Sequence, residues 1–153
     1  MCWYGTLELK QVAKKNIHCK KIIAYNHKEN YYFPYYVKHG KIRKYEFGKT
    51  YTSDIAITNN TLRDDGTHHC CINNGLHCYS NDLRHAFKTI NESSIVITDN
   101  YGGNNYFGYD KLTNRLPVLV HCVIPKGATY YENKYGEIVT DKLQIVEKIR
   151  IKL

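Results

Sequence analysis

Histidine and cysteine stand side by side at three places in this 153-residue chain, in His68-His69-Cys70-Cys71, His77-Cys78 and His121-Cys122. Imidazole nitrogens and thiolates are ligands that zinc prefers in proteins. Adjacent residues of a strand point to opposite faces, however, so each His-Cys pair offers one ligand to a given site. No Cys-x2-Cys spacing is present. We therefore expect no bound metal and interpret these side chains as buried thiols and scattered histidines. Zinc binding through residues 68–71 and His77 or Cys78 is the alternative.

The cysteines also bear on the compartment. The chain has no N-terminal apolar run and no stretch of about 20 apolar residues, so we expect neither a signal peptide nor a membrane helix. Six cysteines without a secretion signal indicate reduced thiols in the cytoplasm. Cys2 would gain a neighbouring free amine as its base if Met1 were removed, and whether that happens stays open.

Positive charge is concentrated in the first third of the chain. Residues 1–50 hold 11 Lys/Arg against 3 Glu, whereas residues 51–153 hold 11 charges of each sign, so the whole net charge of +8 lies in the first 50 residues. Such asymmetry is typical of a surface that contacts nucleic acid or another anionic partner. A solvated basic surface without a partner is the alternative. The lysines we expect to make such contacts are Lys10, Lys14, Lys15, Lys20 and Lys21.

The pattern of apolar residues predicts a chain built mostly of sheet. Tyrosine is abundant and proline scarce, which favours strands. We expect strands at residues 21–25, 31–37, 75–79, 94–98 and 118–124, and others between residues 138 and 151. The run Val118–Ile124 is apolar on both faces, which is typical of a central strand, and His121 and Cys122 within it should be buried. Residues 59–74 and 99–114 are polar and rich in turn formers, and we expect them to be loops.

One helix is expected after the strand at residues 75–79. Ser80 is a suitable N-cap, and Leu83, Ala86, Phe87 and Ile90 would share one helical face. The predicted fold class is therefore α+β, a mostly antiparallel, twisted two-sheet core with one clear helix, formed by a single domain over residues 1–153.

Four segments resemble a family of small uncharacterised proteins from Bacteroides-type gut bacteria and their phages. They are Tyr45–Tyr51, Gly75–Ser80, Val123–Tyr131 and Glu137–Val146, and the opening Met1-Cys2-Trp3-Tyr4 is also similar to members of that group. The resemblance implies a bacterial or phage source and no particular activity.

A second resemblance carries a chemical expectation. The order of Gly75-Leu76 and Ser80, a helix, a central strand and then Glu137-Ile138-Val139 resembles the second half of the ADP-ribosyltransferase fold. The resemblance implies NAD as cofactor, with His77 in the place of an aromatic residue that stacks on nicotinamide. It implies that Glu137 is the catalytic glutamate, which stabilises the cation formed as nicotinamide leaves. The cofactor would be bound by Tyr25, Asn26, Tyr79 and Ser80.

Two functions of different class follow. The first is nucleotide binding, with transfer of ADP-ribose, in a cleft between His77 and Glu137. The alternative is a non-catalytic binding module that acts on a host protein or nucleic acid through the basic N-terminal third and exposed tyrosines. Whether the protein is an enzyme is left open, and the position of His77 relative to Glu137 separates the two functions.

Overall fold

A computed structural model describes residues 3–35, 44–80, 86–91, 94–98, 104–108 and 115–149. Within these ranges the chain forms fifteen strands and one short 3-10 helix, η1 (Leu7–Leu9). In chain order the strands are β1 (Trp3–Thr6), β2 (Lys10–Val12), β3 (Ile17–Asn26), β4 (Tyr31–Pro34), β5 (Thr50–Thr52), β6 (Ala56–Leu62), β7 (His68–Asn74), β8 (Leu76–Ser80), β9 (Ala86–Asn91), β10 (Ser94–Thr98), β11 (Asn104–Gly108), β12 (Leu116–Ile124), β13 (Thr129–Glu132), β14 (Glu137–Thr140) and β15 (Lys142–Lys148).

The largest sheet has nine strands, and all its pairings are antiparallel. Its order is β2-β13-β14-β8-β3-β12-β15-β5, and β4 pairs with β3 beside this path. Strand β12 lies between β3 and β15, which confirms the predicted central strand. Cys122 in β12 is fully buried as expected. His121 is not, because its side chain is 29% exposed on the outer face of the sheet, so that expectation is wrong.

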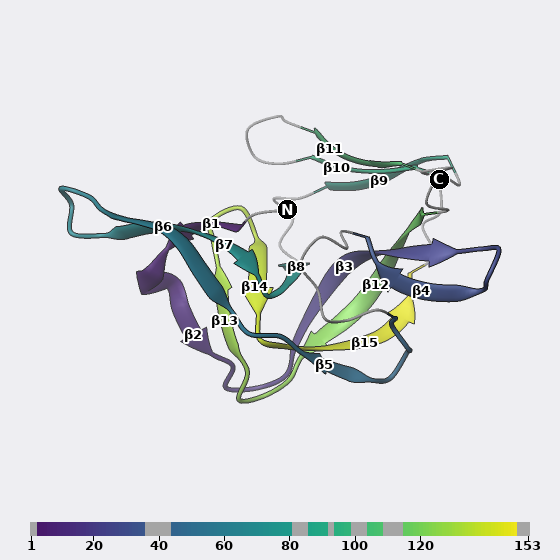
Figure 1. Cartoon of the computed structure of the whole chain (residues 1–153), viewed down its shortest axis with the longest axis horizontal. Helices are drawn as coiled ribbons and strands as arrows, with labels where there is room; N and C mark the ends of the chain where they lie inside the picture. The colour runs from purple at the N-terminus through teal and green to yellow at the C-terminus, as the bar shows by residue number, and fades with distance from the viewer. Residues whose placement is uncertain are drawn as a thin grey trace.

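The main sheet curls around its own core (Figure 1). Ala13 and Ala128 come from one end of the sheet and Tyr51 and Leu143 from the other, yet all four belong to one buried cluster. The inner faces of β3, β8 and β12 fill the space between these ends with alternate side chains, because successive residues of a strand point to opposite faces. The inner face is therefore the principal core of the described chain.

Two three-stranded sheets flank the main sheet (Figure 1). The sheet β1-β7-β6 meets the outer face of β13 and β14 through a second buried cluster that includes Trp3, Ile72, Tyr131 and Val139. The sheet β11-β10-β9 lies next to β12. The expectation of a two-sheet core is therefore wrong, because three sheets are present in the described ranges.

The prediction of an α+β fold with one clear helix is wrong. Residues 86–91 form β9, which pairs antiparallel with β10, and Ser80 ends β8 instead of capping a helix. Residues 81–85, which include Leu83, lie outside the described ranges. The spacing of Ala86, Phe87 and Ile90 fits a helical face, but so short a window also fits a strand, and the β10 ladder supplies the backbone hydrogen bonds. The ADP-ribosyltransferase resemblance loses the helix on which it depended.

Both predicted loops contain strands. Residues 59–74 hold most of β6 and all of β7, and Asn104–Gly108 forms β11 within the predicted loop 99–114, whose other residues lie outside the described ranges. All seven residues of β6 are exposed, so the strand has no apolar alternation by which it could be recognised.

Candidate functional site

The two residues expected to face each other across a cleft lie on adjacent strands. Strand β8 pairs with β14, with Tyr79 opposite Glu137 and His77 opposite Val139. Opposed residues of an antiparallel pair project from the same face, so His77 and Glu137 share the outer face of the sheet. A hydrogen-bonded strand pair leaves about 5 Å between its strands, which is no space for a nucleotide to lie between them.

Contacts within the chain hold Glu137 in place. Asn133 Nδ2 donates to Glu137 Oε1 over 3.1 Å, and the Glu137 backbone N–H donates to Asn133 Oδ1 over 3.1 Å. The indole Nε1 of Trp3 donates to the Glu137 carbonyl oxygen over 2.8 Å. These bonds stabilise the turn between β13 and β14, which is a structural task for Glu137.

His77 lies in a desolvated position. Its Nε2 is 3.1 Å from the carbonyl oxygen of Asn73, so the neutral ring with a proton on Nε2 donates a hydrogen bond there. Burial, reinforced by the nearby positive charge of Lys21, lowers the pKa of His77 to about 4. The imidazole is thus uncharged near neutral pH.

The four expected cofactor residues do not converge. Tyr79 is buried and Ser80 donates its backbone N–H to Gly136, so both lie near Glu137. Tyr25 and Asn26 lie at the far end of β3: Tyr79 pairs with Lys20, and five residues of strand separate Lys20 from Tyr25, roughly 17 Å. Asn26 Oδ1 accepts the backbone N–H groups of residues 28 and 29 and so forms the β3–β4 turn.

Tyr25 belongs instead to a row of rings that we call the aromatic row (Tyr25, Tyr32 and Phe47). The ring centroids of Tyr25 and Tyr32 are 4.9 Å apart, and those of Tyr32 and Phe47 are 4.8 Å apart. Tyr25 and Tyr32 are partly buried and pack against the principal core, whereas Phe47 is 42% exposed. The aromatic row therefore extends from the core, against which Tyr25 and Tyr32 pack, to the exposed ring of Phe47. Its signal in the sequence was the abundance of tyrosine in the strands expected at residues 21–25 and 31–37.

The part of the sequence that carries the aromatic row is rich in lysine and arginine. Residues 27–50 hold six Lys/Arg and two Glu. Among the described ones, Lys28, Lys44 and Lys49 are exposed. The Nζ of Lys44 lies 4.6 Å from the ring centroid of Tyr31, which projects from the opposite face of β4 to Tyr32. Positive charge and exposed aromatic surface thus occur on the same elements.

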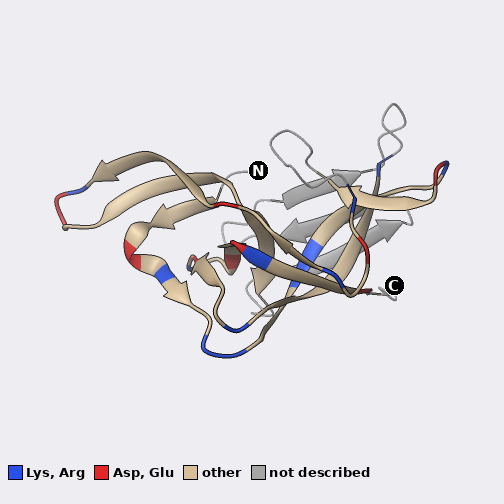
Figure 2. Cartoon of the chain, turned by 60° about the horizontal axis from the view of Figure 1, so that its bottom comes forward, with Lys and Arg blue, Asp and Glu red and all other residues tan. Residues whose placement is uncertain are grey.

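The five lysines predicted to contact a partner do not form one surface. Lys14 and Lys15 are exposed in the β2–β3 turn, which hydrogen-bonds with the turn that carries Lys126 (Ala13 N to Ala128 O, 2.8 Å). Figure 2 shows the two turns side by side at the bottom of the molecule, and we call Lys14, Lys15 and Lys126 the basic end. Lys10 is exposed on β2, and Lys20 lies on the outer face of β3.

Lys21 points inward, at a fork in the main sheet. Strand β3 pairs with β8 at Cys19 and Lys20, then with β4 from Ile23 onward, so Lys21 lies where the partner changes. Its Nζ donates to the His77 carbonyl oxygen over 2.5 Å. Burial lowers the pKa of the Lys21 amine. The amine of Lys21 is therefore engaged by a contact within the fold, and the side chain is only partly exposed.

Three thiols lie beside Lys21 on the inner face, those of Cys19, Cys78 and Cys122, all buried. Hydrogen bonds with Cys122 and, to a smaller extent, with Cys78 hold the pKa of the Cys19 thiol well above its usual value, and burial adds to this effect. Thiols in such surroundings are unreactive, which agrees with their interpretation as core residues. In the part of the chain that the structure describes, no group of three or more His, Cys, Asp or Glu side chains is arranged to hold a metal ion.

A row of titratable groups crosses the outer face and escaped the sequence analysis. His18 Nδ1 lies 2.9 Å from His121 Nε2, and His121 Nδ1 lies 3.9 Å from Glu147 Oε1. The register of β12 with β3 and β15 brings these residues together, so distance along the chain concealed them. We assign this row no reaction.

Comparisons of the chain with protein-family models, curated proteins and solved structures found no match. The resemblance to a family of Bacteroides-type bacteria and their phages stays a prediction. Among the described residues, no helix is long and apolar enough to cross a membrane. Cys2 lies outside the described ranges.

Proposed function

We propose that this protein is a non-catalytic module that binds single-stranded nucleic acid, with bases stacking on the aromatic row. The observation that carries the proposal is the succession of Tyr25, Tyr32 and Phe47 at centroid spacings of 4.9 and 4.8 Å, ending in an exposed ring. Bases stack on such rings without regard to sequence, and each stacked base contributes about 1–3 kcal/mol. The exposed Lys28 and Lys49 supply positive charge for the phosphates. The cytoplasm is the expected place of action.

The support beneath the row favours binding over catalysis. Tyr25 and Tyr32 rest on the principal core, and the Tyr25 hydroxyl donates to Asn30 Oδ1, so little side-chain freedom remains to be lost on binding. The basic end lies beyond the other end of β3 and offers a second contact for the phosphate backbone. NAD-dependent transfer of ADP-ribose stays a prediction that we do not adopt, because the contacts of Glu137 and His77 are structural.

The experiment measures fluorescence anisotropy of labelled single-stranded DNA and RNA of mixed sequence. We expect binding at low salt that weakens steeply as salt rises, because bound lysines release counterions from the phosphates. Phe47→Ala should weaken binding about tenfold, the loss of one stacked base. Tyr4→Ala is the matched control, since Tyr4 is a 66% exposed aromatic residue on β1, in a different sheet from the aromatic row.

Two results would refute the proposal. One is the absence of binding to either nucleic acid at low salt. The other is equal affinity of Phe47→Ala and the parent. Titration with NAD in the same buffer tests the transferase prediction separately, and heat of binding that Glu137→Gln abolishes would restore it.

A further inference from the structure

Strand β6 is an exposed edge. In the sheet β1-β7-β6 it pairs with β7 on one side, and its other side faces no strand among the described residues. All seven residues from Ala56 to Leu62 are exposed, and Figure 1 shows the β6–β7 hairpin reaching away from the main sheet. The edge carries no lysine and no proline, the residues by which proteins usually prevent pairing at an edge. Ile57 and Leu62 are large apolar side chains that are 41% and 64% exposed.

The order of residues in this edge is nearly palindromic. It reads Ile57-Thr58-Asn59-Asn60-Thr61-Leu62. In an antiparallel pair centred between Asn59 and Asn60, each residue meets one of its own kind from a second copy. Ile57 faces Leu62, Thr58 faces Thr61, and Asn59 faces Asn60. Cross-strand pairs of aliphatic residues and of threonines are among those that stabilise antiparallel sheets.

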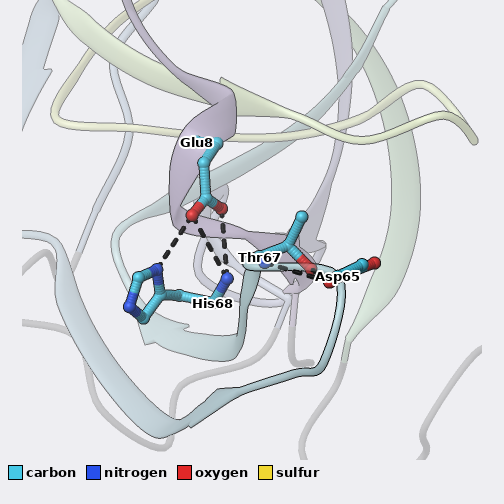
Figure 3. Close-up of polar contacts among 4 residues, drawn as sticks. All are labelled: Glu8, Asp65, Thr67 and His68. Carbon is cyan, nitrogen blue, oxygen red and sulfur yellow. Dashed lines mark hydrogen bonds and ion pairs between the residues drawn. The ribbon is translucent and has the colours of Figure 1, made fainter.

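Polar contacts hold the hairpin in a defined shape (Figure 3). Glu8 of η1 accepts the backbone N–H of His68 and lies 2.9 Å from its Nδ1, which ties the start of β7 to the rest of the chain. Asp65 Oδ1 accepts both the backbone N–H and the hydroxyl of Thr67 and so closes the turn. The hydrogen bonds from His68 lower the pKa of Glu8, which keeps it ionised as an acceptor. A strand fixed in this way loses little entropy on pairing.

A bulge restricts which strand fits this edge. Thr58 pairs with Cys71 and Thr61 with His69, so β6 carries one extra residue at its centre, where Asn59 has a φ of 53°. A regular strand that pairs with this edge would find the series of backbone hydrogen bonds interrupted at the bulge. A second copy brings the same bulge to the same point, and asparagine side chains offer both donors and acceptors to bridge it.

We propose that two copies of this chain associate through antiparallel pairing of their β6 strands, with Ile57 of each copy opposite Leu62 of the other. The interface is a two-fold one, in which the same patch serves both copies. It is small, so the dimer is weak and depends on concentration. Figure 1 places β6 and β4 on opposite sides of the molecule, so the dimer leaves both aromatic rows open.

Sedimentation velocity of the full chain, from low micromolar to millimolar concentration, tests the association. We expect the parent protein to shift from monomer to dimer as concentration rises. The double variants Ile57→Lys/Leu62→Lys and Ile57→Glu/Leu62→Glu should each stay monomeric, because like charges then face each other at both pairs. An equimolar mixture of the two should dimerise, since each lysine then faces a glutamate.

Val12→Lys is the matched control, because Val12 is 57% exposed on β2 at the edge of the main sheet, and it should dimerise like the parent. A parent that is monomeric throughout overturns the proposal. So do double variants that dimerise alone, a mixture that stays monomeric although both variants keep the parent's circular dichroism, and loss of the dimer in Val12→Lys. Binding of nucleic acid is measured through Phe47, so failure of one proposal leaves the other intact.

Discussion

At the scale of single residues, His77 and Lys21 are basic groups that the fold has partly removed from water. Burial lowers the pKa of both, and the carbonyl oxygen of His77 accepts the hydrogen bond from the Lys21 ammonium. Both belong to segments that the sequence analysis assigned to function. Their positions give them an effect on stability that depends on pH.

His77 should make the protein sensitive to acid. Its pKa is about 4 in the folded state and 6.5 ordinarily, so between these values the unfolded chain binds more protons. The free energy of unfolding is therefore largest above pH 6.5 and falls as pH decreases towards 4, by at most about 3 kcal/mol. His77→Gln keeps a donor for Asn73 without the titration. Urea unfolding at several pH values should show a shallower decline for this variant, and an unchanged decline would contradict the assignment.

At the scale of elements, β12 organises the main sheet. It pairs along its whole length with β3 and over part of its length with β15, and most of its side chains are buried on one face or the other. Strand β12 is consequently intolerant of charge, whereas the turn that follows it faces water.

Val118→Asp should unfold the protein or nearly so. Val118 is 4% exposed and lies opposite Ile23 in the core, so a carboxylate there loses its hydration without a partner, at a cost of several kcal/mol. Val120 is a poorer choice, because Lys21 lies directly opposite and would pair with the new charge. Lys126→Asp, in the exposed turn, is the control and should change stability by about 0.5 kcal/mol or less. Thermal melting of Val118→Asp that matches the parent would contradict the assignment of β12.

At the scale of the whole molecule, Trp3 joins two of the sheets. Its side chain is 1% exposed, its ring meets that of Tyr131 edge to face at 5.7 Å, and its Nε1 donates to the Glu137 carbonyl oxygen. The indole ring passes over Gly5, where a Cβ atom would collide with it. Strand β1 thereby fastens the sheet that contains β6 to the outer face of β13 and β14.

Trp3→Ala should destabilise the protein by about 3–5 kcal/mol, the usual cost of removing a large buried aromatic side chain. Tyr4→Ala is the control, since the neighbouring Tyr4 side chain is 66% exposed, and it should be close to neutral. Urea unfolding followed by circular dichroism measures both. A Trp3→Ala protein as stable as the parent would mean that β1 is not the fastening element.

Local pattern was enough for the strands that bury apolar side chains. The run Val118–Ile124 has one structural solution, because a segment that is apolar on both faces must be covered on both. The strand expected at residues 21–25 lies within β3, and the strand expected from residue 31 forms β4 as far as Pro34. The predictions of a loop from residue 59 and of a helix over residues 86–90 were wrong, because β6 is exposed on all sides and the spacing in β9 fits both a helix and a strand. Pairing with neighbouring strands decided both conformations. The remaining features of the site depend on contacts between residues that are far apart in the sequence. Pairing of β8 with β14 made His77 and Glu137 neighbours without a cleft, the fork in β3 turned Lys21 inward, and the packing of Phe47 against Tyr32 created the aromatic row. Contacts between residues so far apart in sequence depend on which strands pair, and no local preference specifies that choice.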